Sequence, residues 1–577
     1  MPFRPFPTRG TLRRPQWRPA DLVVVAGVFA LLYGLLRFGQ AARAPIDPGV
    51  MRRTIDTDPA LLPGYAARSA ARMFVALGFS VAFTLVYAPL AARSRRAEKV
   101  LIPALDILQS VPVLGFLAIT VNGFLALFPG SMLGLEAASI FAIFTSQVWN
   151  LTFSFYHSLL TQPRALDEAA RMMRLNRWQR FWKLDVPGAM IPLVWNGMMS
   201  FGGGWFFLVA SEAITVNNRS FALGGIGSYV ASAGARGQLG RVGLAILTMV
   251  VMVIGINVVL WRPLVAWAER FRMEESEPAD QPRSVVLDLL RRSHVPRLVA
   301  RGWRPVGEGI GRVMRVLGTA HRPLSPAPAR RRVGDVVFGV LVAAGALGGA
   351  WEAVRYVAGT AGLGAFAHAA GLGAVTFGRV LVVLVVSTLV WVPVGVRIGL
   401  SPRLARYAQP VVQVLASFPA NFLFPLVAAV LVATRVSLDW GGIVLMALGA
   451  QWYILFNAIA GAIAIPSDLR EAMASLGVSG WLRWRRLILP AIFPAYVTGG
   501  ITASGGAWNA SIVAEVVTYG GTVLTATGLG AYITKATAAG DFGETLAGII
   551  VMCAYVVVLN RLVWRRLYRL AEQRFSL

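Results

Sequence analysis

Lysine, cysteine and histidine are all scarce in this sequence. Its 577 residues include three lysines, four histidines and a single cysteine, Cys553. One cysteine cannot form a disulfide within the chain, and scattered histidines do not give the clustered spacing of a metal site. The sequence therefore predicts neither a disulfide framework nor a metal centre. The histidines are His157, His294, His321 and His368.

The few lysines also exclude one nucleotide-binding motif. A P-loop requires G-x-x-x-x-G-K-[ST], in which backbone amides and the lysine hold the phosphates. Lys99, Lys183 and Lys535 follow glutamate, tryptophan and threonine, so the sequence has no Gly-Lys pair. The chain is therefore predicted to be no enzyme, with no ATPase site and no cofactor of its own.

Charge is scarce too, and arginine dominates what there is. Charged residues make up 14% of the chain, 56% of residues are hydrophobic, and the net charge is +28. Soluble domains carry about 25% charged residues. A large positive charge can indicate nucleic-acid binding, but here the arginines lie mainly between and beyond apolar runs. That pattern orients membrane helices, so we predict no nucleic-acid partner.

Apolar runs that are long enough to cross a bilayer recur along the whole chain. They predict an all-α polytopic membrane protein of about twelve spans, six in each half. We interpret the first run as a retained signal-anchor helix, because an arginine-rich tail precedes it and no convincing cleavage site follows. The spans centre near 22–38, 70–92, 101–127, 133–160, 187–215, 242–268, 335–357, 376–400, 409–433, 440–465, 490–517 and 544–563.

The arginines also predict how the chain is oriented and divided. Residues 1–20 form a basic tail without acidic residues, and the C-terminal end is basic as well, so both termini are expected in the cytoplasm. Residues 273–333 are rich in proline and charge, which is typical of a cytoplasmic linker that can include surface helices. The expected halves are residues 21–272 and 334–577.

The two halves are related by an internal repeat. A shift of 303 residues superimposes rare residue types over more than a hundred positions, and further upstream the shift becomes 307. Because both halves begin in the cytoplasm, the repeat is parallel, about an axis along the membrane normal, and one path can run between the halves. The pairs include Trp149–Trp452, Trp205–Trp508, Glu212–Glu515, Arg72–Arg379, Ser110–Ser417 and Pro112–Pro419.

A charged segment follows the fourth span of each half. The first reads PRALDEAARMMRLNRWQRFWKLDVPGAMIP and the second PSDLREAMASLGVSGWLRWRRLILPAIFP. Each opens with a proline that can end the preceding span and closes with a proline suited to the first turn of the next helix. Short amphipathic helices are expected between the prolines, on the cytoplasmic surface, where a soluble partner can reach them.

These segments resemble the EAA loop of binding-protein-dependent ABC importers, whose pattern is EAA, three residues, Gly, nine residues and I-x-L-P. In the second half Met473 replaces an alanine, and in the first half Arg174 replaces the glycine. Arg174 is expected to disfavour the turn that glycine allows. The matching residues are Glu168, Ala169, Ala170, Leu184 and Pro187 in the first half and Glu471, Ala472, Gly477, Leu487, Leu489 and Pro490 in the second.

In that family the loop is a coupling helix that docks on an ATPase subunit. The resemblance therefore implies a type I importer-like permease in a bacterial inner membrane, which works by alternating access. It also implies two separate P-loop ATPase subunits, which bind the ATP and Mg, and an extracytoplasmic solute-binding protein. The flanking sequences LQSVPVLGF, GGGWFFLVASEAI, LASFPANFLFP and GGAWNASIVAEVV resemble nitrate/sulfonate/taurine-type permeases, so a small anion is the expected substrate.

Polar residues inside the spans are candidates for the path, because they are costly in lipid and usually face the bundle interior. Glu212 and Glu515 are expected near the outer ends, at a gate or paired with arginine. Pro112 and Pro419 are expected to break or kink their helices. For each candidate, hydrogen bonding between helices is the alternative role. The candidates are Ser110, Asn150, Asn196, Ser200, Glu212, Ser417, Asn421, Asn457, Ser504, Asn509, Ser511 and Glu515.

Other functions remain open on the sequence alone. An ion-coupled secondary transporter could also have twelve spans and a parallel repeat. An importer of this kind could carry another polar solute, such as an amino acid. A membrane-embedded enzyme would need clustered His, Asp or Cys residues, and the sequence shows no such cluster.

Overall fold

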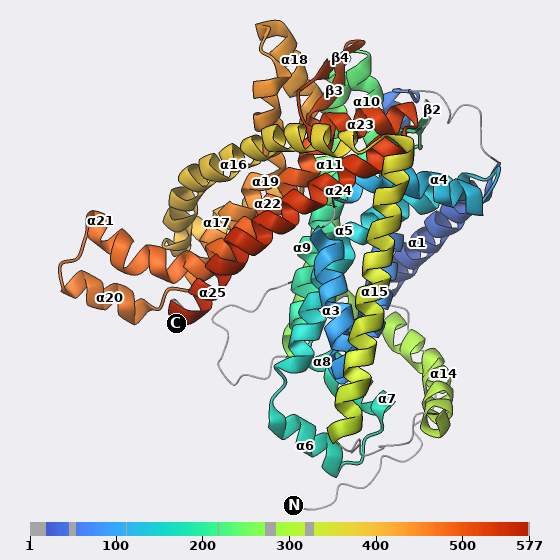
Figure 1. Cartoon of the computed structure of the whole chain (residues 1–577). Coiled ribbons are helices and arrows are strands. Elements are labelled where there is room, and N and C mark those ends of the chain that lie inside the picture. Colours follow the sequence, from blue (N-terminus) through green and yellow to red (C-terminus); the bar gives the residue numbers. More distant parts are fainter. Residues whose placement is uncertain are drawn as a thin grey trace, which may run out of the picture.

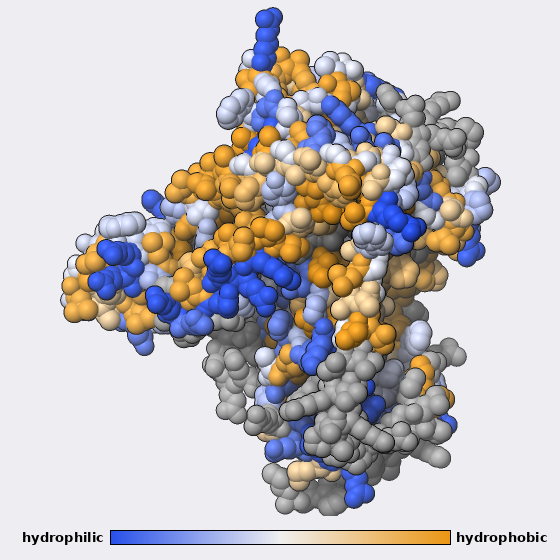
Figure 2. Space-filling model, viewed as in Figure 1, coloured by the Kyte–Doolittle hydropathy of each residue, from blue (hydrophilic) through white to orange (hydrophobic). Residues whose placement is uncertain are grey.

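The computed structural model describes residues 19–45, 54–110, 112–216, 219–271, 284–317 and 328–574. The tail predicted over 1–20 and the linker predicted over 273–333 lie partly outside these residues. Within them the protein consists almost entirely of helices, with two short β-hairpins (Figure 1). Apolar side chains cover much of the visible face of the bundle, as contact with lipid requires (Figure 2).

The first half consists of α-helices, short 3₁₀ and π-helical turns and one β-hairpin. Its last long helix, α11, continues through the π-helical turn η5. The elements are α1 (Pro19–Arg43), α2 (Leu62–Arg93), α3 (Arg95–Ser110), η3 (Val113–Phe116), α4 (Leu117–Leu127), α5 (Met132–Leu160), α6 (Arg164–Met172), α7 (Arg177–Arg180), η4 (Phe181–Asp185), α8 (Val186–Gly188), α9 (Met190–Glu212), β1 (Ala213–Val216), β2 (Arg219–Ala222), α10 (Ile226–Ala235), α11 (Leu239–Ile256), η5 (Asn257–Trp261) and α12 (Arg262–Ala268).

Two linker helices separate the halves, and the second half then repeats the pattern. The elements are α13 (Val285–Arg292), α14 (Val295–Leu317), α15 (Pro328–Thr360), α16 (Gly364–Gly399), α17 (Pro402–Ser417), η7 (Ala420–Leu423), α18 (Phe424–Thr434), α19 (Leu438–Ile463), α20 (Ser467–Ser475), α21 (Gly480–Arg483), η8 (Trp484–Ile488), α22 (Leu489–Ala514), β3 (Val516–Tyr519), β4 (Thr522–Thr525), α23 (Leu529–Ala539), α24 (Phe542–Leu559), η9 (Asn560–Trp564) and α25 (Arg565–Arg574).

The predicted repeat is present in the backbone. The π-helical turns η4 and η8, and likewise η5 and η9, are 303 residues apart. The hairpins recur with the same spacing, since Ala213 pairs with Ala222 and Val516 pairs with Thr525. These hairpins were not predicted, because four-residue strands carry too short a pattern to separate from the ends of apolar helices.

Ten of the twelve predicted spans are single helices that are long and apolar enough to cross a membrane. The third predicted span of each half is instead broken at the proline that was expected to break or kink it. Pro112 and Pro419 both adopt extended backbone conformations, and a short 3₁₀ turn follows each. In the second half, the two helices flanking the break meet at 80°.

The first helices of the halves depart from the repeat. Helix α1 packs against α2 and α5 of its own half, whereas α15 packs against α24 and also against α3 of the other half. The expected symmetry of two six-helix repeats therefore holds for the later helices but not for α1 and α15.

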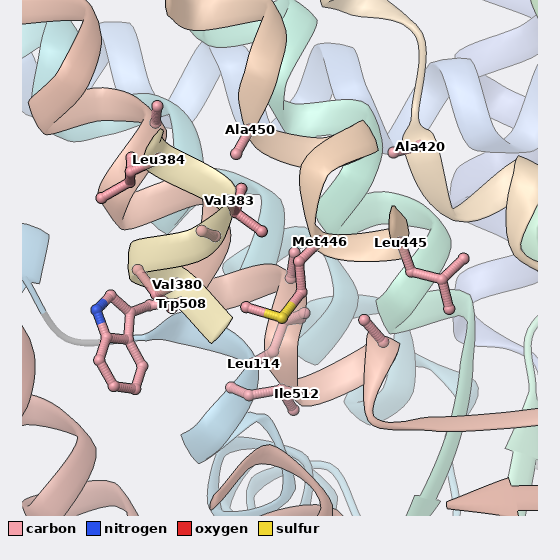
Figure 3. Packing of buried hydrophobic residues seen from close by; sticks show 14 of the residues in the cluster. Leu114, Val380, Val383, Leu384, Ala420, Leu445, Met446, Ala450, Trp508 and Ile512 are labelled. Carbon is pink, nitrogen blue, oxygen red and sulfur yellow. The ribbon is translucent and has the colours of Figure 1, made fainter. Parts of the chain in front are cut away.

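One hydrophobic core crosses the boundary between the halves. It combines residues of α16, α19 and α22 with residues of the first half such as Leu114 and Leu135. Figure 3 shows Leu114 beside Met446 and Ile512. The two hairpins lie at one end of the molecule, and helices α6, α7, α20 and α21 lie toward the other (Figure 1). We call these the hairpin end and the loop end.

Candidate functional site

Each predicted coupling segment consists of two short helices joined by a tight turn. We call residues 164–185 and 467–488 the first and second EAA segments. Glu168 lies in α6 and Glu471 in α20, and both side chains are exposed. The segments occupy separate corners of the loop end (Figure 1).

The turn between the short helices is the same in both EAA segments. Arg174 has φ +49° and Gly477 has φ +66°, so both adopt the left-handed conformation. The Leu175 N–H donates to the Ala170 carbonyl at 3.1 Å, and the Val478 N–H donates to the Met473 carbonyl at 2.9 Å. This is the Schellman ending of a helix. Arg174 put this turn in doubt, but the turn forms there as well, because flanking hydrogen bonds hold a residue with a Cβ in the left-handed conformation.

Arg174→Gly is expected to stabilise the first EAA segment, because glycine adopts positive φ without the steric cost of about 1 kcal/mol that arginine has. The measurement is amide hydrogen exchange at Leu175, which should slow about fivefold. Gly477→Arg is the reverse control and should speed exchange at Val478. Equal protection in wild type and both variants would contradict this account.

The two EAA segments are fastened to their halves in different ways. In the first, the buried Asp185 pairs with Arg93 at the end of α2 and lies 3.5 Å from Arg180. Arg180 also pairs with Asp167 at 2.5 Å. In the second half the positions aligned with Arg93, Asp167 and Asp185 are Leu400, Arg470 and Ile488. Ion pairs therefore anchor the first segment, whereas two of the three aligned positions in the second, Leu400 and Ile488, are apolar.

Both EAA segments expose apolar side chains that a protein partner could cover. Met173 and Leu476 occupy aligned positions directly before the turn, and both are largely exposed. Met172 and Trp481 are largely exposed as well. Exposed apolar side chains beside an exposed glutamate are typical of a docking surface, in which a few anchors provide most of the binding energy.

At the hairpin end of the first half, one buried arginine holds two carboxylates. Arg72 contacts Glu136 through Nε and Nη2, at 2.6 and 2.7 Å, and contacts Glu212 through Nη1 at 2.6 Å. Glu212 also accepts hydrogen bonds from the Ser69 hydroxyl, at 2.6 Å, and from the Gly227 N–H, at 2.7 Å. The Arg72 side chain is 1% exposed and Glu212 is 0% exposed. The carboxylate of Glu212 is thus engaged inside its own half.

The second half has the same arrangement at the aligned positions. Arg379 contacts Asp439 at 2.7 Å and Glu515 at 3.0 Å, and Thr376 donates to Glu515 at 2.8 Å. The Ala531 N–H also donates to Glu515, at 3.0 Å. We call Arg72–Glu136–Glu212 and Arg379–Asp439–Glu515 the first and second clamps. They differ in exposure, since the side chain of Glu136 is 8% exposed and that of Asp439 is 43% exposed.

Glycine is required where the chain wraps around each clamp. A Cβ at Gly225 would lie 2.3 Å from the Glu212 carboxylate, and one at Gly528 would lie 2.4 Å from that of Glu515. This contact explains the GGIG and TGLG sequences. Nearby, the Tyr229 hydroxyl donates to the Thr57 carbonyl at 2.8 Å. Burial raises the pKa of the Tyr229 phenol, so it remains a donor at neutral pH.

The broken helices connect the halves through two asparagines of the second half. Asn421, just after Pro419, donates to the Phe206 carbonyl at 3.0 Å. Asn509 in α22 accepts from the Val113 N–H, also at 3.0 Å. The repeat aligns Phe206 with Asn509, so these contacts are pseudo-symmetric, yet both side chains come from the second half. The interface is therefore asymmetric.

Two small cavities lie at aligned places between the halves. One, of about 20 Å³, is lined by Trp205, Trp261 and Ser417 among others. The other, of about 60 Å³, is lined among others by Trp508, Trp564, Ser504 and Asn509. Both are large enough for water. Of the polar candidates, Ser417, Ser504 and Asn509 thus face the boundary between the halves.

The remaining candidates lie elsewhere. Asn196 donates to Ser154 at 3.1 Å, so it connects α9 to α5, and Asn457 donates to the Tyr453 carbonyl one turn earlier. Ser511 donates to the Trp508 carbonyl in the same way. Ser200 is buried and Asn150 is exposed. Ser110 ends α3, and its side chain lies outside the described residues. As pathway residues, all these candidates remain predictions.

Several residues of the clamps were not recognised in the sequence. Glu136 and Asp439 are 303 residues apart, and Ser69 and Thr376 are 307 apart. The repeat could have revealed them, but both pairs differ in residue type and so give no identity at the shift. Among the described residues, no group of three His, Cys, Asp or Glu side chains could hold a metal ion.

Two pseudo-symmetric helical bundles fused in one chain, with paired loop segments at one end, define a two-repeat membrane permease. The chain belongs to the family described as the binding-protein-dependent transport system inner membrane component, whose model matches residues 75–266 and 391–577. Both repeats thus carry the family domain, and the chain is a multi-pass protein of this class of inner-membrane transport system.

Three of the known relatives each match about a third of this chain. A nitrate import permease of Leptolyngbya laminosa is 29% identical over 185 residues, which is 32% of this chain and 63% of that protein. A bicarbonate transport permease of Synechococcus elongatus is 28% identical over 178 residues, 31% and 61% of the two chains. A taurine transport permease of Escherichia coli is 28% identical over 200 residues, 33% and 66%. In each case the match spans less than two thirds of the relative.

Proposed function

We propose that this chain is the transmembrane subunit of an ATP-driven ABC importer and forms the solute path between its two halves. The observation that supports this most is the pair of EAA segments. They share one turn geometry, lie at the same end of the molecule and leave Glu168, Met173, Glu471 and Leu476 exposed. A secondary transporter has no need for such paired segments.

 In this proposal separate P-loop ATPase subunits dock on the two EAA segments, and these partner subunits bind and hydrolyse ATP with Mg. Two ATPase subunits are expected, one under each half, and a solute-binding protein would deliver its cargo at the hairpin end. The loop end and both termini would then face the cytoplasm of a bacterium. This chain itself would bind no nucleotide.

The contacts between the halves fit alternating access. At the hairpin end the Gly520 N–H donates to the Gly234 carbonyl at 3.1 Å, and the Gly521 N–H donates to the Ala235 carbonyl at 2.8 Å. In each half, the clamp connects the residues beside the hairpin to the long helices of the same half. Each half can therefore move as a unit. Closure of the ATPases would draw the EAA segments together, and these hairpin-end contacts would then open.

We propose a small anion as the solute. The relatives carry nitrate, bicarbonate and taurine by name. The residues at the boundary between the halves, Ser417, Ser504 and Asn509, are neutral hydrogen-bonding groups that could hold the oxygens of such an anion. Another polar solute, such as an amino acid, is the second candidate, because the same groups would hydrogen-bond to it.

The test is uptake by proteoliposomes that contain this chain, the ATPase encoded beside it and the matching binding protein. Uptake of nitrate, bicarbonate or taurine is expected to require ATP and to stop when the P-loop lysine of the ATPase is replaced. Dissipating the ion gradients should leave it unchanged. Uptake driven by an ion gradient in the absence of the ATPase would instead identify a secondary transporter.

A further inference from the structure

Helix α14 of the linker has two chemically opposite faces. At 100° per residue, Val295, Val299, Trp303, Ile310 and Val313 fall on one stripe. Arg301, Arg304 and Arg312 fall on the other side. Residues 295–317 include five arginines and one acidic residue, Glu308.

The apolar stripe is not covered by the described part of the protein. Trp303 is 68% exposed and Val299 is 53% exposed, and Ile310 and Val313 are exposed as well. Helix α14 contacts α1, α7 and α13, and these contacts leave the stripe open. An apolar stripe of this length at a surface indicates contact with a further surface.

The start of α14 is held where the first membrane helix begins. Asp21, in the first turn of α1, accepts hydrogen bonds from the Ser293 hydroxyl at 2.8 Å and from the His294 N–H at 2.6 Å. The apolar run of α1 begins at Leu22, so Asp21 lies at the expected boundary between lipid and water. These contacts place the first turn of α14 at the depth of the lipid headgroups.

We propose that α14 lies in the plane of the membrane and binds anionic lipid headgroups. The apolar stripe would enter the boundary of the acyl chains, and the arginines would pair with headgroup phosphates. The excess of arginine over acidic residues favours an anionic membrane over a protein surface, and the Asp21 contacts supply the depth. Because α14 also contacts α7, the bound lipid steadies the first EAA segment and not the second.

Spin labels on the two faces of α14 test this proposal in the full chain. The only native cysteine is replaced by Cys553→Ala, and a nitroxide is attached through Val299→Cys or Arg301→Cys. The chain is reconstituted in phosphatidylcholine vesicles with or without phosphatidylglycerol. Collisions with oxygen report lipid exposure, and collisions with a water-soluble nickel chelate report exposure to water. Val385→Cys, on the exposed surface of α16, is the reference for lipid.

With phosphatidylglycerol, the ratio of oxygen to nickel accessibility at Val299 is expected to approach that of Val385 and to exceed that of Arg301 several-fold. The difference should shrink without phosphatidylglycerol and at high salt, which screens the arginines. Equal nickel access at both positions would overturn the proposal, because the helix would then lie in water. Protection of Val299 from both reagents would also overturn it, because a protein surface would then cover the stripe.

Discussion

Arg72→Met is expected to destabilise the protein by about 3–5 kcal/mol, because removing one partner of a buried ion pair leaves the other uncompensated. Arg72 is the cation that contacts Glu136 and Glu212, and both carboxylates are buried. Without it, Glu212 must either remain charged away from water or take up a proton. The measurement is thermal unfolding of the detergent-purified protein, followed as the loss of the monodisperse species.

Three further variants make this prediction specific. Arg68→Met, one turn earlier on α2 and exposed, should have little effect. Arg379→Met should cost less than Arg72→Met, because water reaches the partly exposed Asp439. Adding Glu212→Gln to Arg72→Met should recover part of the loss, since one of the two carboxylates left without Arg72 is then neutral. If Arg72→Met unfolds no more easily than Arg68→Met, the first clamp does not stabilise the fold.

The double charge reversal Glu168→Arg plus Glu471→Arg is expected to release the ATPase from the purified complex and to abolish ATP-driven uptake. Removing a charged contact from an interface costs about 2 kcal/mol or more, and 1.4 kcal/mol is tenfold in affinity. Two such losses should weaken docking by well over tenfold. Both glutamates are exposed, so the permease itself should fold and purify at the wild-type yield.

Glu308→Arg is the control, because Glu308 is an exposed glutamate on helix α14, outside the EAA segments. It should retain the ATPase. The single variants should differ from each other, since ion pairs anchor only the first segment. Retention of the ATPase by the double variant, at equal permease yield, would exclude the EAA segments as the docking sites.

Much of the fold could be predicted because its signals are local or periodic. Apolar runs indicated the spans, and Pro112 and Pro419 indicated the breaks, since proline cannot donate a backbone hydrogen bond. The hairpins were missed because four residues are too few for a pattern. The different packing of α1 and α15 was missed because each looks, on its own, like any apolar helix.

The EAA segments could be predicted from the sequence more fully than the clamps. The EAA segments are contiguous in sequence, so a motif identified them. The clamps are not contiguous, since 140 residues separate Arg72 from Glu212 and 64 separate it from Glu136. The repeat pointed to Arg72 and Glu212 but left open whether they pair or face the path. Arg174 put the left-handed turn of the first segment in doubt, but the turn forms, because a preference for glycine is weaker than a set of flanking hydrogen bonds.

The sequence by itself determined that this is a helical membrane protein with a parallel repeat, broken third spans and paired EAA segments. Hydrophobic periodicity, proline chemistry and short motifs act within a few turns of chain, so they can be read without coordinates. Only the tertiary structure decided which carboxylates meet Arg72 and Arg379, that Asp185 anchors only the first EAA segment, and that Asn421 and Asn509 join the halves. Those contacts depend on which distant helices pack together, and packing depends on the shapes of many side chains at once.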